Sequence, residues 1–406
     1  MSEKRRLRYG TSSTLRLDLP AEALVADCTE VPGTVVSDPA EAVAGALSNP
    51  VSFPPLGEAV VPGDRVVIAI DPDVPRSGEI VAGVVGALLD TVVEPDHITV
   101  LQTRRHLPTD QITAELPTSA RQVNFAVHDP DDQGQLAYLA ASKDATPVVL
   151  NRLLCDADLV IPVNLLRPES ALLYTGPHAG LCPTFSDSET QRQFRGPDAM
   201  ASGDQQRHLW DKANEIAWLL GVQLTLQVVA GPGESVLRVL AGLDEHVSRQ
   251  GRALVNATWA YDVSRRAELV VATIEGQLDN QSWENLGRAL HAAQQACLPE
   301  GTIVLCTELS CEPGPALERL MGGGGDGETL LTPSGSTHWE DSVAAHLLGD
   351  ARDASHIFLL SQLDEGAVES LGMGHIEKPE QINRICRQYN SCILLANAHR
   401  AILRPH

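Results

Sequence analysis

The sequence predicts an α/β protein of two lobes, each a mainly parallel sheet flanked by helices, with an active-site cleft between them. Short β-branched runs alternate with longer helical patterns along nearly all of the 406 residues, as in parallel strands covered by helices. Hydrophobic residues make up 43% of the chain and charged residues 20%, a composition that supports a buried core and excludes wholesale disorder. At about 150 residues per domain, the length predicts two or three domains.

The first run of alternation begins with a strand over 65–70 and a helix over 78–89. The strand is a run of β-branched and apolar residues, and the helix has apolar residues at helical spacing. An amphipathic helix is expected over 211–220. Further strands are expected at 98–101, 123–127, 159–163 and 224–229.

A helix over 244–256 leads into a second run of alternation. Four strands are expected there, at 268–273, 302–306, 356–360 and 392–395, with a helix over 283–297 between the first two. We therefore divide the chain into an N-terminal α/β domain, 1–260, and a C-terminal α/β domain, 261–406. The ligand is expected in the cleft between them, because α/β folds bind ligands at the carboxyl ends of their strands.

The charge of the chain argues against two classes of partner. With 30 Lys and Arg against 53 Asp and Glu, the formal net charge is −23, and such a surface repels nucleic-acid phosphates and anionic lipids. No apolar stretch approaches the roughly 18 residues of a membrane span, and the start lacks the apolar segment of a signal peptide. None of the eight cysteines forms a Cys-x-x-Cys pair, which favours free thiols in a reducing compartment. We expect a cytoplasmic protein that binds neither nucleic acid nor membranes.

Polar residues follow directly on two of the early strands. The turn 71–76 would present two carboxylates and a guanidinium to a cleft, although Asp71 or Asp73 could equally cap the following helix. After the strand at 98–101 comes His106, flanked by arginines. A histidine there could exchange a proton near neutral pH while the arginines hold a substrate carboxylate, or it could simply be solvated.

Two later segments have the same character. The stretch 167–180 contains Glu169 and His178, which could form an anion nest or a metal-ligand pair. Asn285 and Arg288 stand three residues apart on one helix and could together bind a carboxylate, although an exposed helix face explains them equally well.

These four segments, in this order, resemble the nickel-pincer lactate racemase family. The resemblance runs from about residue 7 to the last strand and includes the turn 71–75, the His-x-Pro at 106–108 and the segment 149–161. It implies an isomerase that racemises or epimerises a small 2-hydroxy acid, its partner being a small-molecule carboxylate. In that family, nickel in a lysine-tethered pincer nucleotide takes a hydride from the α-carbon and returns it, and two histidines exchange the hydroxyl proton.

Carried over position by position, the resemblance assigns proton transfer to His106 and Glu169, with Glu169 in place of the family's second histidine. It assigns the substrate contacts to Asp71, Arg76, Asn285, Arg288 and Trp339. The cofactor-binding run falls at Thr175, Gly176 and His178. We expect His106, Glu169 and Arg288 to face one another across the cleft.

Two positions depart from the cofactor pattern. Ala179 stands where the family has its tethering lysine, and Phe194 stands where a histidine ligates nickel. Alanine has no amine and phenylalanine cannot bind a metal, so the nickel-pincer nucleotide is expected to be lost or altered here. The sequence leaves three alternatives: a divergent racemase, in which His178 could be a substitute metal contact; a non-catalytic family member (a pseudoenzyme) binding a small carboxylate; or a cofactor-free lyase or hydratase.

Overall fold

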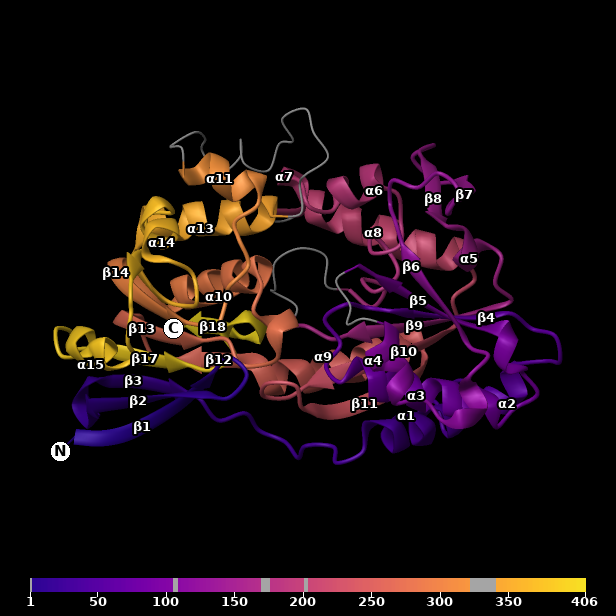
Figure 1. Cartoon of the computed structure of the whole chain (residues 1–406), viewed down its shortest axis with the longest axis horizontal. Helices are drawn as coiled ribbons and strands as arrows, with labels where there is room; N and C mark the ends of the chain where they lie inside the picture. Colours follow the sequence, from indigo (N-terminus) through magenta and orange to yellow (C-terminus); the bar gives the residue numbers. More distant parts are fainter. Residues whose placement is uncertain (1, 105–108, 169–175, 201–203, 322–340) are drawn as a thin grey trace.

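The computed structural model describes residues 2–104, 109–168, 176–200, 204–321 and 341–406. Two six-stranded sheets lie at the centres of two lobes placed side by side (Figure 1). The strand order is β11-β10-β9-β4-β5-β6 in the first sheet and β16-β15-β14-β13-β17-β3 in the second. The predicted α/β class with two lobes is confirmed.

The first sheet is parallel except for β11, which pairs antiparallel to β10. Its strands are β4 (Val66–Ile70), β5 (Ile98–Thr103), β6 (Asn124–His128), β9 (Leu159–Leu165), β10 (Leu224–Ala230) and β11 (Val236–Leu243). Every residue of β4 is buried. Alternate side chains point to opposite faces of a strand, so Ile68 packs in the same cluster as α1 (Pro39–Ser48) and α3 (Ser77–Leu89), and Ala69 with Ala217 of α8 (Asp204–Leu219).

The second sheet is parallel throughout. Its strands are β3 (Leu24–Cys28), β13 (Ala267–Thr273), β14 (Cys297–Cys306), β15 (His356–Leu360), β16 (Gly374–His375) and β17 (Cys392–Leu395). One face packs against α10 (Trp283–Ala296) and α13 (Ser342–Ala354). The other is covered by the hairpin β1 (Ser2–Tyr9) and β2 (Ser13–Pro20) and by α15 (Glu380–Cys386). Because β3 pairs with β17, a strand from near the start of the chain completes the second lobe, whereas the division at 260 assigns it to the first.

Every predicted strand and helix is present, with ends that differ by a few residues. The largest differences are that α8 begins at 204 instead of 211 and that β14 begins at 297 instead of 302. Helix α9 (Asp244–Trp259) runs past the predicted end at 256. The indole of Trp259 is buried and donates to the carbonyl of Ala230, 2.9 Å away, so a contact between elements extends this helix.

The shorter elements are α2 (Leu56–Ala59), α4 (Thr109–Ala114), α5 (Arg152–Cys155), α6 (Ser188–Gln193), α7 (Pro197–Met200), α11 (Pro315–Met321), α14 (Glu365–Ser370), β7 (Leu136–Ala141), β8 (Pro147–Asn151), β12 (Ala260–Val263) and β18 (Ile402–Pro405).

The last residues of the chain hold the two lobes together. Arg400, in the short 3-10 helix η5 (Ala398–Arg400), donates from Nη1 to the carbonyls of Gly231 (2.5 Å) and Gly233 (2.7 Å), which lie between β10 and β11. Asn397 accepts a bond from the Gly233 amide at 3.1 Å. Since these backbone groups are buried, each needs such a partner, and η5 is therefore fixed against the first lobe.

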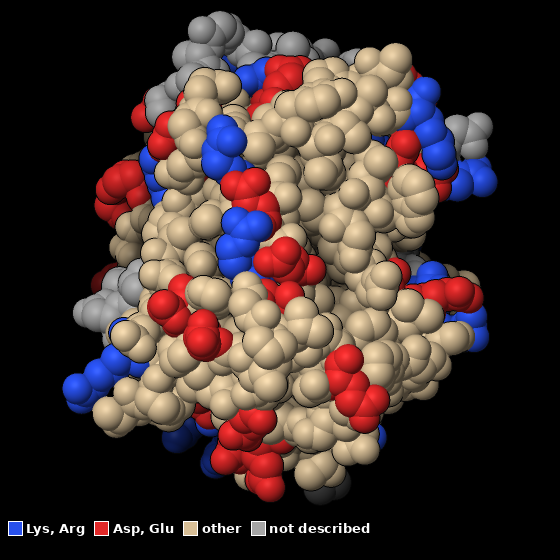
Figure 2. Space-filling model, turned by 90° about the vertical axis from the view of Figure 1, so that its right-hand side faces the viewer, with Lys and Arg blue, Asp and Glu red and all other residues tan. Residues whose placement is uncertain are grey.

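The surface matches the acidic composition. On the end of the first lobe drawn in Figure 2, basic side chains stand singly or beside acidic ones, without a continuous basic patch. Within the part of the chain that the structure describes, no helix is long and apolar enough to cross a membrane.

Two glycines of α3 provide a test of the helix packing. A Cβ at Gly83 would lie 2.7 Å from the carbonyl oxygen of Ala40 and 2.7 Å from Cβ of Val43, both on α1, whereas a Cβ at Gly86 would meet nothing within 4 Å. We expect Gly83→Ala to lower the free energy of unfolding by about 1–3 kcal/mol through overpacking. Gly86→Ala should raise it by up to about 1 kcal/mol, because alanine favours the helix. Urea unfolding of both variants measures the difference, and equal effects would contradict the close packing of α1 and α3.

Candidate functional site

The carboxyl ends of β4 and β9 carry an ion-pair cluster. Asp71 follows β4, and its carboxylate accepts bonds from the backbone amides of Asp73 (2.9 Å) and Leu165 (3.4 Å). Arg167, just after β9, lies 3.6 Å from Asp71 and hydrogen-bonds to Asp73. Burial raises the pKa of the Asp71 carboxyl, and the guanidinium of Arg167 opposes that rise. Neither aspartate caps α3, because the residue before that helix is Arg76.

Arg76, which the resemblance assigns to the substrate, has a different neighbour. It adopts a left-handed backbone conformation with φ of 50°. Its Nε donates to Glu79 at 2.6 Å, and the side chain lines a cavity of about 790 Å³ together with Glu79 and Glu115. Asp71 thus pairs with Arg167, whereas Arg76 pairs with Glu79 and lines this acidic cavity, which Asp73 lines as well.

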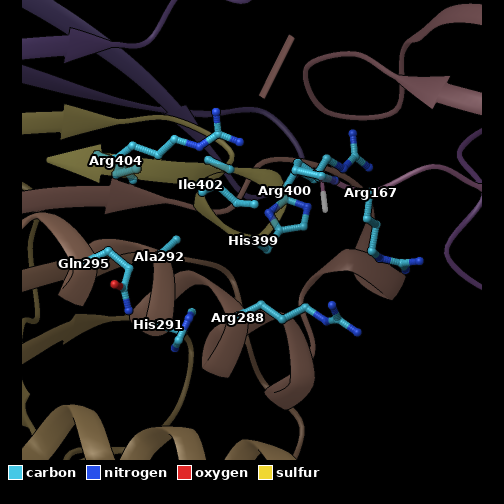
Figure 3. A pocket seen from close by; sticks show the side chains of 12 residues that line it. Arg167, Arg288, His291, Ala292, Gln295, His399, Arg400, Ile402 and Arg404 are labelled. Atoms are coloured by element: carbon cyan, nitrogen blue, oxygen red, sulfur yellow. The ribbon is translucent and has the colours of Figure 1, made fainter. Parts of the chain in front are cut away.

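A pocket rich in cationic side chains lies where the two lobes meet (Figure 3). We call it the arginine pocket; its volume is about 190 Å³. Its ionisable lining residues are Arg167, Arg288, His291, His399, Arg400 and Arg404. No carboxylate is among the described residues that line it, although the chain has 53 acidic residues. Figure 3 shows the guanidinium groups of Arg167, Arg288 and Arg400 at one end of the pocket, with Arg404 toward the other.

Arg288 is placed in this pocket by α10. Its Nη2 donates to Glu284, one helical turn earlier, at 2.9 Å, while its buried Nε has no hydrogen-bond partner in the part of the chain that the structure describes. Burial lowers the pKa of the guanidinium and Glu284 opposes the change; an arginine still stays charged. The predicted pairing with Asn285 is not seen: the Asn285 amide donates to the carbonyl of Asn280 at 3.1 Å, and Asn285 does not line the pocket.

His399 is the least expected member of the site. It is buried, and neither ring nitrogen has a hydrogen-bond partner among the described residues. Burial, followed by the charges of Arg400, Arg288 and Arg167, lowers the pKa of the imidazole well below its usual value of 6.5. The ring is therefore neutral at neutral pH, with one nitrogen able to donate and the other to accept.

His399 and Arg400 were not predicted from the sequence, although their position along the chain indicates a place at the cleft. They come three and four residues after the alanine that follows the predicted strand 392–395, where a polar loop should line the cleft of an α/β fold. The same rule, that polar residues after a strand lie at the cleft, singled out the segment 167–180, and Arg167 of that segment lines the arginine pocket.

Beside the arginine pocket lies a second one of about 500 Å³, which we call the indole pocket because Trp210 and Trp218 line it. Arg167 lines both pockets. Gly176 and His178, two of the three positions assigned to the cofactor, line the indole pocket. The His178 ring lies 3.4 Å from the Asp244 carboxylate.

The two positions to which the resemblance assigns the tether and the nickel ligand both pack against apolar side chains. Ala179 is half-buried, and Phe194 is 1% exposed in a cluster with Val148 and Leu150. Among the residues with described side chains, the one grouping that could ligate a metal is Glu94, Asp96 and His97, none of which lines either pocket.

Four predicted site residues, His106, Glu169, Thr175 and Trp339, lie outside the described residues. The expected meeting of His106 and Glu169 with Arg288 therefore stays a prediction.

The fold and the pocket between the lobes define a two-lobed α/β protein of the kind that binds a ligand in an interdomain cleft. Residues 9–197 match the family described as the lactate racemase N-terminal domain. Over its length the chain is similar to the lactate racemase apoprotein of Thermoanaerobacterium thermosaccharolyticum, with a TM-score of 0.78, 17% identity and coverage of 99% of this chain and 100% of that one.

A second similar structure is that of a Thermotoga maritima protein, with a TM-score of 0.67, 15% identity and coverage of 92% and 100%. No curated protein matches the chain. Residues 9–197 therefore match the lactate racemase N-terminal domain, and the chain as a whole shares the fold of the lactate racemase apoprotein.

The ion pair at Arg167 generates a stability prediction. Arg167→Gln removes the cation that pairs with the buried Asp71 and the half-buried Asp73, and we expect the free energy of unfolding at pH 7 to fall by about 3–5 kcal/mol. Without Arg167, nothing from that guanidinium opposes the rise that burial causes in the pKa of Asp71. A folded protein that holds a carboxyl with a raised pKa becomes less stable as the pH rises through that pKa. The loss should therefore be smaller at pH 5 than at pH 7.

Arg65→Gln is the matched control, because the side chains of its pair with Asp158 are 60% and 47% exposed and such pairs contribute little. Urea unfolding at both pH values measures the effect. A loss for Arg167→Gln that equals the control's, or that does not change with pH, would sink this interpretation.

Proposed function

We propose that this protein binds a small 2-hydroxy carboxylate in the arginine pocket, without the nickel-pincer nucleotide of its family. The observation that carries the proposal is the lining of that pocket by Arg288, Arg400 and His399, with no carboxylate among the described residues there. In a chain of net charge −23, a pocket with this lining favours an anion over a cation or a neutral ligand.

The individual side chains match the two polar groups of a 2-hydroxy acid. Guanidinium groups bind carboxylates through charge-assisted hydrogen bonds, and the Nε of Arg288 has a hydrogen still to donate. The neutral ring of His399 can donate to a hydroxyl oxygen or accept from the hydroxyl proton. A volume of about 190 Å³ suits an acid of only a few carbon atoms.

The residues at the family's cofactor positions do not fit a tethered nickel group. Ala179 supplies no amine, and Phe194, whose side chain has no ligand atom, lies inside a mainly apolar cluster. The buried Lys212 is no substitute tether, because its ammonium donates to Gln193 at 2.7 Å and it lines neither pocket. We therefore derive no hydride-transfer step for this chain.

Racemisation or epimerisation of the 2-hydroxy acid is the second candidate. It is favoured by the lactate racemase N-terminal domain over 9–197. Acid–base residues alone cannot catalyse this racemisation by the family's hydride-transfer route, because that route needs a hydride acceptor, which a cofactor provides.

We also propose a reducing compartment such as the cytoplasm. All eight cysteines are free, and burial raises the pKa of several, including Cys28 to about 12 and Cys155 to about 11. Such thiols stay protonated and inert, which suits cysteines used for packing.

Calorimetric titration with L-lactate and with propionate tests the binding function. Lactate should bind to the full chain, and propionate, which lacks the hydroxyl, should bind about 3–10-fold more weakly, the value of one neutral hydrogen bond. Arg288→Gln should weaken lactate about 10–100-fold, because a charged hydrogen bond is lost. Arg249→Gln, whose side chain is 64% exposed on α9, should leave both affinities unchanged. If lactate releases no heat of binding at millimolar concentration, the proposed function is wrong.

Metal analysis separates the two candidates. Protein co-expressed with the enzymes that make the pincer cofactor should contain no stoichiometric nickel and show no visible chromophore. It should also leave the optical rotation of D-lactate unchanged. Stoichiometric nickel together with loss of optical rotation would establish the racemase instead.

A further inference from the structure

We propose that the indole pocket receives an aromatic ring carried by the same acid, so that the ligand class is a 2-hydroxy acid with an aryl side chain. This inference rests on the proposed function of the arginine pocket and specifies the remainder of its ligand.

The two pockets meet at one side chain. Arg167 lines both, and its neighbours continue into one pocket each: Pro168 into the arginine pocket and Leu166 into the indole pocket. A carboxylate held beside Arg288 and Arg400 therefore lies within one arginine side chain of the indole pocket. In 3-phenyllactate two carbon atoms link the carboxylate to the ring, so a ligand with its carboxylate in the arginine pocket would carry its ring beside Arg167.

One face of α8 presents aromatic surface to this pocket. Trp210, Asn214 and Trp218 are spaced four residues apart, so they share a helix face, and all three line the pocket. Trp218 is 78% exposed, although it is the largest type of apolar side chain. An exposed indole at the edge of a pocket is suited to stacking on a planar ring.

The charges of the indole pocket favour a neutral group. Its charged lining residues are Arg167, Arg252, Asp244 and Glu245, so the positive and negative formal charges are equal. This differs from the arginine pocket and does not favour a second anion such as a phosphate. A ligand that places a neutral ring in the indole pocket and a carboxylate in the arginine pocket would match the charges that line each pocket.

The polar wall of the indole pocket is held in place by a chain of hydrogen bonds. Gln227 donates to the Ser248 hydroxyl at 2.8 Å, and that hydroxyl donates to Asp244 at 2.9 Å. The other oxygen of Asp244 lies 3.4 Å from His178. Because Gln227 is fully buried and Ser248 and His178 nearly so, the wall is preformed, and a ligand need not reorganise it.

The test compares L-lactate with L-3-phenyllactate on the full chain, by calorimetry and by tryptophan fluorescence. Phenyllactate should bind about 10–100-fold more tightly, since ring burial and stacking together contribute about 1.4–2.8 kcal/mol. It should also change the indole emission, whereas lactate should not.

Three variants locate the ring. Trp218→Ala should reduce the affinity for phenyllactate to near that for lactate, remove most of the emission change and leave lactate binding unaltered. Tyr138→Ala, which removes another exposed aromatic side chain, 63% exposed and outside both pockets, should change neither. Arg288→Gln should weaken both acids by the same factor, because both use the arginine pocket.

The failure of this inference differs from the failure of the proposed function. If lactate binds but phenyllactate binds no more tightly, or Trp218→Ala has no effect, the aryl class is wrong and the arginine pocket stands. If phenyllactate changes the emission but is insensitive to Arg288→Gln, the indole pocket is a separate site and the single-ligand proposal is wrong. If neither acid binds, the proposed function fails first.

Discussion

The site depends on the pairing of Arg167 with Asp71 and Asp73. Two negative groups at the end of β4 and one positive group at the end of β9 are costly to bury separately and much less so together. Their pairing ties together two neighbouring strands where these reach the cleft. It also fixes the one side chain that lines both pockets, so a structural ion pair sets the geometry of ligand binding.

Arg288 and Arg400 are buried in the pocket on the same principle with different partners. Arg288 is compensated by Glu284 within its own helix, and Arg400 by the backbone carbonyls of Gly231 and Gly233. Each is oriented by the protein before any ligand arrives, which reduces the cost of ordering on binding. His399, surrounded by three of these cations, stays neutral, so the site combines fixed positive charge with a neutral hydrogen-bonding ring.

The sequence predicted the regular elements well and the partners of polar residues poorly. Strands such as 356–360 and 392–395 were placed to the residue, because buried parallel strands are continuous apolar runs. The local hairpin β1–β2 was not predicted. The placement of β3 in the second sheet was not predicted either, since pairing with a strand more than 350 residues away leaves no local pattern. Arg76 was assigned to the substrate together with Asp71, and in the structure it has a left-handed backbone conformation and donates to Glu79.

The sequence by itself determined the α/β class, the acidic charge and the chemistry absent at Ala179 and Phe194, because these follow from residue types and their local spacing. Only the tertiary structure decided that Arg167, Arg288 and His399 line one pocket and that Asn285 does not. These residues are brought together by the order of strands in two sheets and by the docking of η5 on the first lobe. Such long-range arrangements arise from packing between distant segments, which no short stretch of sequence encodes.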